Sequence, residues 1–173
     1  MMTFFPTPYP DEILYSVFAR YHEKSPNFNG SETARDLFNV KRIVCSLEFP
    51  TLLANLVRNM PLNSPFDVDR LIFEHTLFPY YTVFLSLENR GIIRRYMLHG
   101  DVEIYNKITG IINPLAENKF LRFCPKCNKE DMERYGELYW HRVHQIRGIY
   151  ICPHHKIPIY NSSVSLEDNK YKY

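Results

Sequence analysis

Two four-residue turns near the C-terminal end of the chain share one plan. Cys124-Pro125-Lys126-Cys127 and Cys152-Pro153-His154-His155 both read Cys, Pro, any residue, then Cys or His. Three thiolates and one imidazole at this spacing are the ligand set of a closed tetrahedral zinc site, which leaves no coordination position for a substrate. We therefore expect one structural Zn²⁺ on Cys124, Cys127, Cys152 and His155. His155 is preferred to His154 because only His155 reproduces the spacing of the first turn.

The rest of the chain is long and apolar enough to fold around a core of its own. Its 173 residues are 45% hydrophobic and include 13 Tyr and 12 Phe, which fits one domain, or one domain with a small metal-held module. The opening MMTFFPTPYPDE has no cationic stretch before a long apolar run, and no window approaches 18 apolar residues. We therefore expect no signal peptide, no membrane span and a cytoplasmic location. Cys45, outside the paired turns, is expected to be a buried thiol.

Residues 1–115 are expected to form an α-helical body. Apolar residues recur with helical spacing between Pro and Gly breaks. We predict a helix over about 11–24 capped by Asp11, a second capped by Ser31, a third opened by Pro50, a fourth opened by a capping-box variant from Ser64 to Asp67, and a fifth with Pro79 in its first turn. Gly91 and Gly100 are expected to mark further breaks in the chain. A compact helix-turn-helix within the first three helices is the alternative to plain packing, but about ten residues separate the second helix from the third.

Residues 116–162 are expected to form a zinc-finger module, followed by a polar tail at 163–173. The 24 residues between the paired turns allow a helix over Glu137–Gln145 that ends at Gly148. A β-hairpin is predicted from Ile149–Cys152 and Ile157–Tyr160. The fold class predicted from the sequence is therefore mainly α, with a multi-helix N-terminal body and a C-terminal module of one helix and a small hairpin.

The charge is distributed unevenly along the chain. From Lys119 to Lys156 there are eight basic and four acidic residues, a net charge of +4, whereas the whole chain carries +2. A basic segment of this size allows contact with a polyanion, although a solvated surface has the same composition. The candidate phosphate-binding residues are Lys126, Lys129, Arg134, Arg142, Arg147 and Lys156.

The sequence offers little for catalysis. It has no H-x-E turn of a zinc deaminase, no P-loop, no G-x-S-x-G and no G-x-G-x-x-G. His141 and His144 lie three residues apart, without the spacing of a metalloprotease helix, so we interpret them as packing or surface residues. A metal-dependent nuclease that uses His141, His144 or His154 beside the structural zinc is the less favoured alternative. We expect a protein that is not an enzyme and has no small-molecule substrate.

Three segments resemble one family. FCPKCNKEDMERYGELYWHRVHQIRGIYICPHHKIPIY resembles the zinc-binding segment of the TnsD/TniQ target-selection proteins of bacterial transposons. FFPTPYPDEILYSVFARYH is similar to the Pro-rich leader and first helix of that family, and EHTLFPYY to an internal TnsD-like motif. The resemblance covers nearly the whole chain and places Cys124, Cys127, Cys152 and His155 on the zinc positions of the family.

The resemblance implies a non-enzymatic adaptor. Such proteins bind double-stranded target DNA, or a targeting complex, and recruit the AAA+ ATPase that activates the transposase. TnsD proteins are longer, with further DNA-binding domains, so the end at Tyr173 suggests a truncation or a minimal relative. The alternative is a pure protein-interaction module that docks the ATPase while other domains bind DNA.

Overall fold

The computed structural model of the protein describes residues 2–43, 46–101 and 118–166. Within these ranges the N-terminal body contains α1 (Leu14–Lys24), α2 (Gly30–Phe38), α3 (Leu53–Asn59), α4 (Val68–His75), α5 (Phe78–Thr82) and α6 (Leu87–His99). The C-terminal part contains β1 (Phe120–Phe123), α8 (Pro125–Tyr135), α9 (Arg142–Gln145) and β2 (Tyr160–Ser165). The expectation of a mainly helical protein with a small β element is therefore confirmed.

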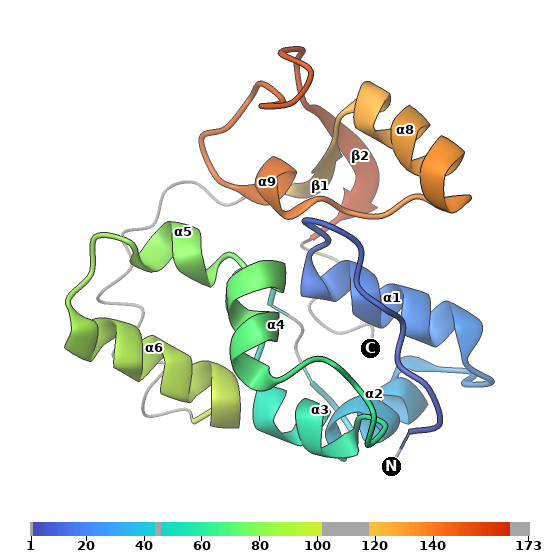
Figure 1. The fold of residues 1–173 in the computed structure, drawn as a ribbon, viewed down its shortest axis with the longest axis vertical. Helices are drawn as coiled ribbons and strands as arrows, with labels where there is room; N and C mark the ends of the chain where they lie inside the picture. The colour runs from blue at the N-terminus through green and yellow to red at the C-terminus, as the bar shows by residue number, and fades with distance from the viewer. Residues whose placement is uncertain (1, 44–45, 102–117, 167–173) are drawn as a thin grey trace.

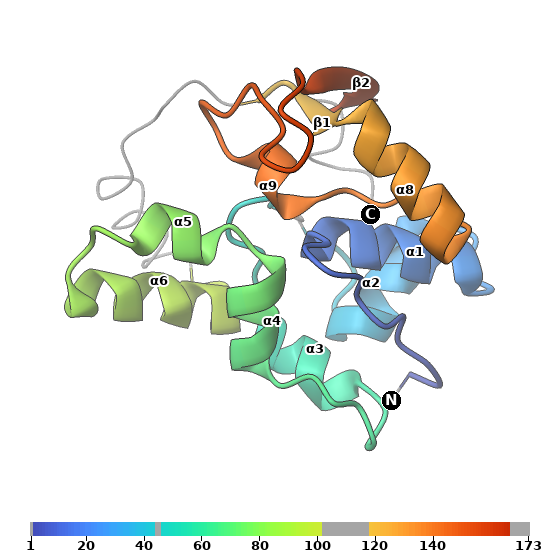
Figure 2. The same cartoon turned by 45° about the horizontal axis from the view of Figure 1, so that its top comes forward.

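The C-terminal elements form a module that sits on the first helix of the body. In Figure 1 the two strands with α8 and α9 lie above α1, while α5 and α6 project to the left. The same arrangement is seen after the turn of view in Figure 2, where the leader rises from the N-terminus in front of the body and reaches the module at the start of α1. The module and the start of the chain are therefore neighbours in space.

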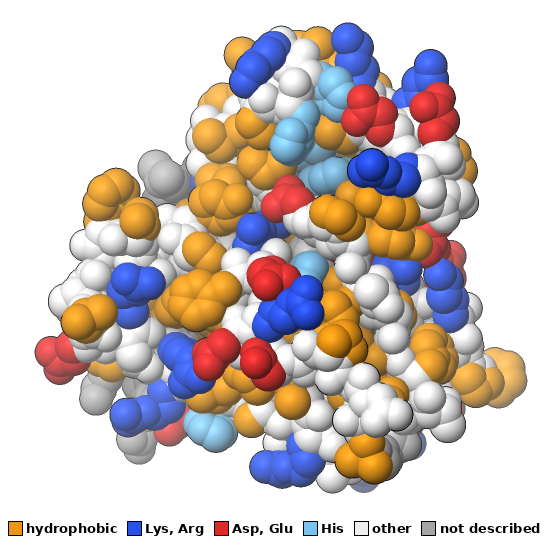
Figure 3. Space-filling view, viewed as in Figure 1, with side chains coloured by type: hydrophobic (Ala, Val, Ile, Leu, Met, Phe, Trp, Pro, Cys, Tyr) orange, Lys and Arg blue, Asp and Glu red, His pale blue; other side chains and the backbone are white. Residues whose placement is uncertain are grey.

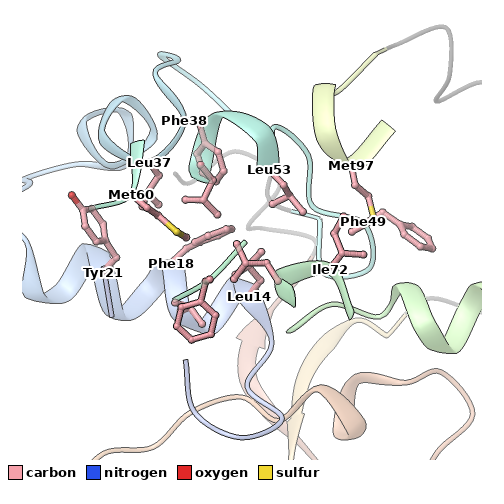
Figure 4. Close-up of a cluster of buried hydrophobic side chains, with 14 of the residues drawn as sticks. Leu14, Phe18, Tyr21, Leu37, Phe38, Phe49, Leu53, Met60, Ile72 and Met97 are labelled. Atoms are coloured by element: carbon pink, nitrogen blue, oxygen red, sulfur yellow. The ribbon is translucent and has the colours of Figure 1, made fainter. Parts of the chain in front are cut away.

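The core of the body is built from one apolar stripe of each helix. Leu14 and Phe18 of α1 face Phe38 of α2 and Leu53 of α3, and all four side chains are at most 2% exposed (Figure 4). The rings of Phe18 and Phe38 meet edge to face with their centroids 5.2 Å apart, an arrangement that aromatic pairs favour. Helical spacing of apolar residues therefore predicted this core correctly.

Three predicted helix starts are shifted by the residue that caps them. Asp11 does not cap α1, because it adopts a positive φ of 57° and the helix begins after Ile13. Asn29, rather than Ser31, caps α2 by accepting a bond from the Glu32 amide. Asp67 caps α4 by accepting from the Arg70 amide, so Ser64 is not the capping residue. The caps of α2 and α4 are thus an amide oxygen and a carboxylate oxygen, as is common at helix starts. Ile13, which precedes α1, is extended and makes no side-chain cap bond.

The helix α6 was missed because Gly91 was interpreted as a break. Ser86 caps this helix by accepting from the Asn89 amide, and the helix then runs through Gly91 to His99. Gly100 ends it in the left-handed conformation, with φ at 71°, as glycine does at many helix ends. Ile93 and Met97 are fully buried in the body core, so tertiary packing outweighs the low helix propensity of the interior glycine.

The helix α3 begins later than predicted, whereas α5 begins where it was predicted. Leu52, in the left-handed conformation, precedes α3, so this helix begins three residues after Pro50. Pro79 lies in the first turn of α5 as predicted. Residues 39–52 separate α2 from α3, so these two helices do not form a compact helix-turn-helix.

The β structure differs from the predicted hairpin. β1 and β2 pair as antiparallel strands, with Arg122 opposite Asn161 and Phe123 opposite Tyr160. The expected hairpin partner strands are joined only by a bridge between Ile151 and Pro158 with flanking backbone bonds. After this short pairing the chain continues into β2, which pairs with β1. β2 extends to Ser165.

Cys45 lies outside the described residues. No helix in the described ranges is long and apolar enough to cross a membrane.

Candidate metal centre

The structure brings the four predicted ligands together. The Nδ1 atom of His155 lies 3.6 Å from the Cys124 sulfur, 3.3 Å from the Cys127 sulfur and 3.8 Å from the Cys152 sulfur. The Cys127 and Cys152 sulfurs are 3.7 Å apart, well beyond the length of a disulfide bond. His154 is exposed, so of the two adjacent histidines only His155 faces the sulfurs.

These distances fit a tetrahedral zinc site. With Zn–S bonds of about 2.3 Å and a Zn–N bond of about 2.0 Å, ligand atoms at the corners of a tetrahedron lie about 3.5–3.8 Å apart. Burial and the two neighbouring cysteines raise the pKa of the Cys127 thiol. Three buried thiolates can therefore share this space only with a cation among them. The cluster can hold one metal ion, and its ligand chemistry suits zinc.

The first turn is the start of a helix. Cys124 is the N-cap of α8 and Pro125 occupies the first helical turn, where its missing amide hydrogen costs nothing. Cys127 lies one turn further along the same helix. Both cysteines are therefore held at the first turn of one helix.

The second turn uses backbone amides. Burial would raise the pKa of the Cys152 thiol, but bonds from the backbone amides of His155 and His154 and from the His155 side chain hold this pKa below its usual value. The Cys152 carbonyl accepts from the Lys156 amide, 2.9 Å away, and Lys156 has a positive φ of 56°. The tight turn after Cys152 thus directs N–H groups at sulfur, as the position of Pro153 predicted.

Two further residues support the ligands: Glu130, which the sequence did not single out, and His144, which was interpreted as a packing or surface residue. Glu130, on α8, accepts from the Nε2 atom of His155 at 2.9 Å and raises the pKa of this imidazole. Such a carboxylate fixes the ring so that Nδ1 faces the metal. His144 is fully buried, and its Nε2 atom lies 3.7 Å from the Cys127 sulfur. Burial, followed by the charges of His141 and other cationic groups nearby, lowers the pKa of His144 to about 3, so this ring is neutral and can donate one N–H to sulfur.

His141 belongs to a structural contact rather than to the metal cluster. Its Nε2 atom lies 2.8 Å from the Asp131 carboxylate of α8. Its ring stacks on Tyr139 with centroids 4.4 Å apart. Within the described chain, His141, His144 and His154 are thus not gathered around an open position beside the four ligands.

The expected helix over Glu137–Gln145 is wrong, because these residues pair with the N-terminal leader. The Ile13 amide donates to the Trp140 carbonyl at 2.9 Å, and Glu12 forms a bridge with His141. Only Arg142–Gln145 form a helical turn, α9. The extended segment before α9 is therefore stabilised by contacts more than 120 residues away in the sequence.

Glu137 joins the module to α1. Its Oε1 atom accepts from Tyr9 Oη at 2.5 Å, Arg20 Nη2 at 2.8 Å and Lys24 Nζ at 2.9 Å. Burial alone would raise the pKa of Glu137, but these bonds lower it to about 2. The carboxylate is therefore ionised throughout the neutral range.

A second carboxylate completes this contact. Glu12 is fully buried and accepts from Ser16 Oγ and Arg20 Nη1, both at 2.8 Å, and from the Tyr9 amide at 2.9 Å. Burial raises the pKa of Glu12 in spite of these bonds. Arg20 thus lies between two carboxylates, with its guanidinium 4.0 Å from the centre of the Tyr9 ring.

The six candidate phosphate-binding residues fall into two groups. Arg142 donates to the Asp11 carboxylate and to the Phe73 and Thr76 carbonyls. Arg147 pairs with Glu48 at 2.5 Å, and its side chain is 8% exposed. Lys126, Lys129, Arg134 and Lys156 are exposed. Basic and acidic side chains are both visible at the top of the molecule in Figure 3, where Figure 1 places the module.

Comparisons with known proteins agree with this geometry. The TniQ family model matches residues 3–159, which include the leader, the helical body and all four cluster residues. The chain is 27% identical over 171 residues to the transposon Tn7 transposition protein TnsD of Escherichia coli. That match covers 98% of this chain and 33% of the relative, so the chain spans about a third of its length. Since the family model extends over most of the sequence, the chain belongs to the TniQ family.

Proposed function

We propose that the protein is a non-enzymatic adaptor for target selection in transposition, which contacts double-stranded DNA and recruits an AAA+ regulator of the transposase. Membership of the TniQ family, together with the likeness to a Tn7 transposition protein, is the observation that carries this proposal. A structural zinc on Cys124, Cys127, Cys152 and His155 would stabilise the module. Its role would be to shape a binding surface, since four protein ligands fill a tetrahedral site. A role on DNA places the protein in the cytoplasm.

The exposed cations of the module are the proposed DNA contacts. Lys126, Lys129 and Arg134 lie on α8 and Lys156 lies in the second turn. Arg142 and Arg147 are left out of this set because they are not fully exposed and their guanidinium groups bind carboxylates or carbonyls of distant segments. Lys156 donates to the Pro153 carbonyl of its own turn but stays exposed. Contacts of this kind would be made with phosphates, which position a protein without reading the base sequence.

The alternative is an interaction module that binds only the ATPase. The acids Glu130 and Glu133 lie on α8 among the same cations, which weakens the attraction for a polyanion.

A variant with Lys126, Lys129, Arg134 and Lys156 replaced by Gln separates the two functions. We expect it to pull down the ATPase as the unchanged protein does, while its affinity for duplex DNA at low salt falls at least tenfold. Undetectable duplex binding by the unchanged zinc-loaded chain would contradict the direct DNA role and favour the interaction module.

A further inference from the structure

The corner between α5 and α6 carries large apolar side chains that the fold leaves in solvent. Phe84 is 98% exposed, Leu87 is 84% exposed and Val83 is 57% exposed. In Figure 3 hydrophobic side chains are visible at the left edge of the molecule, where Figure 1 places α5 and α6. Large apolar groups that are adjacent and exposed mark interaction sites more often than single ones do.

The backbone of this corner is held in place. Thr82 donates its hydroxyl to the Phe78 carbonyl at 2.7 Å, and the Leu85 amide donates to the Thr82 carbonyl at 3.0 Å. Leu85 packs against the core, and Ser86 caps α6. Because the chain is held on both sides of Phe84, little backbone entropy would be lost when a partner binds this ring.

Gly91 adds an independent observation. Leu87, Gly91 and Arg95 are four residues apart on α6, so they lie in one line along the helix, and all three are exposed. A Cβ atom at Gly91 would meet nothing within 4 Å, and the helical backbone there does not require glycine. Glycine is unfavourable inside a helix, and the described parts of the chain supply no packing reason for it. A partner that approaches the helix closely at this point would supply one.

The charges beside the apolar groups indicate the chemistry of the partner. Arg90, Arg94 and Arg95 lie on α6 against one acid, Glu88. Arg94 pairs with Asp69 of α4, whereas Arg90 and Arg95 have no ion-pair partner among the described residues. Aliphatic side chains on the same surface favour a protein over a nucleic acid, whose phosphates and bases would leave Val83 and Leu87 uncovered.

We propose that the α5–α6 surface, made of Val83, Phe84, Leu87, Arg90, Gly91 and Arg95, docks an acidic segment of a partner protein that carries large apolar side chains. This inference rests on the proposed function in one respect: the AAA+ regulator is the protein whose binding to the surface is measured. The surface is formed by the α5–α6 connection and by α6, whereas the cluster cysteines Cys124 and Cys127 lie at the start of α8 in the module. Figure 1 shows α6 and α8 at different ends of the molecule, so docking there leaves the exposed cations of the module accessible.

The test measures the affinity of the full zinc-loaded chain for the AAA+ regulator. Phe84→Ala and Leu87→Ala are expected to weaken binding at least tenfold, as truncation of a central apolar anchor does, and Arg95→Glu is expected to weaken it further. Matched controls are Phe28→Ala and Leu62→Ala, whose side chains are 95% and 90% exposed elsewhere, and these should change the affinity less than twofold.

Gly91→Ala distinguishes docking from folding. It should raise the midpoint of thermal unfolding and yet weaken binding, because the added methyl group favours the helix but stands where the partner approaches. If the unchanged chain binds and the variants at Phe84, Leu87 and Gly91 bind equally well, the α5–α6 surface is not the docking site and the proposed function stands. If the unchanged chain does not bind, both proposals fail. Loss of duplex binding or of self-association in the Phe84 variant, with regulator binding intact, would also overturn this inference.

Discussion

Glu137 connects the metal module to the first helix through bonds from three residues to one carboxylate oxygen. Its partners are Tyr9, Arg20 and Lys24, which come from the leader and from α1. The resemblance to TnsD/TniQ proteins includes a Tyr-Gly-Glu stretch at this position, and the structure gives it a physical reason: the glutamate cross-links segments more than 110 residues apart. Arg20, with a side chain only 9% exposed, depends on this carboxylate and on Glu12 for its charge balance.

Glu137→Gln should lower the free energy of unfolding by about 1–3 kcal/mol, because a partly buried charge network loses one of its two carboxylates. Urea denaturation of the zinc-loaded protein measures the change. Glu133→Gln is the matched control, since Glu133 is exposed and lies 3.8 Å from Lys129, and it should change the stability by less than about 0.5 kcal/mol. Equal effects of the two substitutions would contradict the cross-link.

His144 is expected to support the metal through its N–H group. His144→Phe keeps the volume of the ring but removes the bond to the Cys127 sulfur, so zinc affinity should fall about 10- to 100-fold. Competition with a chelator measures this affinity. His154→Phe is the control, because His154 is exposed, and it should leave the affinity unchanged. An unchanged affinity in His144→Phe would show that His144 only fills space.

At the scale of elements, the glycine inside α6 and the glycine that caps its end are in opposite situations. Gly100 ends the helix with a φ of 71°, and an added Cβ atom would lie 3.4 Å from Leu52. Gly100→Ala should therefore lower the free energy of unfolding by about 1 kcal/mol or more. Gly91→Ala, within the same helix, should raise it by about 0.5–1 kcal/mol. Thermal unfolding of the two variants tests both signs, and a stabilising Gly100→Ala would contradict the helix end described here.

The module and the leader should lose their structure together when the metal ligands are removed. Cys124→Ser or Cys152→Ser should abolish binding of about one zinc per chain and unfold residues 119–165. Because the Ile13 amide donates to the Trp140 carbonyl, the region from Tyr9 to Ser16 should also lose protection from hydrogen exchange. Residues of α2 and α3 should stay protected, since their buried side chains pack within the body. Full protection of Ile13 in a metal-free variant would show that the leader folds independently.

Local patterns predicted some elements and not others. Apolar spacing identified α1, and Pro79 identified the start of α5. The helix α8 was missed, although Pro125 at its start and Gly136 after its end are the usual residues at those positions. Glu130 was missed with it, because its contact with His155 depends on α8 being helical. The extended form of residues 137–141 could not be predicted from local pattern, since it depends on the leader.

At the scale of the molecule, the charge of the module determines how it should respond to salt. If Lys126, Lys129, Arg134 and Lys156 each contact a phosphate, the slope of log affinity for duplex DNA against log salt should be steeper by about 3–4 than in the variant with all four replaced by Gln. Replacing the exposed Arg35, Lys41, Arg42 and Arg58 by Gln changes the net charge equally and should alter the slope much less. Equal slopes in the two variants would indicate attraction to net charge alone.

The most direct test of the adaptor function is retention of the AAA+ regulator on immobilised duplex DNA. The account predicts that the zinc-loaded chain increases retention above the level that the regulator reaches alone, and that Cys152→Ser abolishes the increase. Retention that is the same with and without the zinc-loaded chain would contradict the claim that this protein links the regulator to DNA.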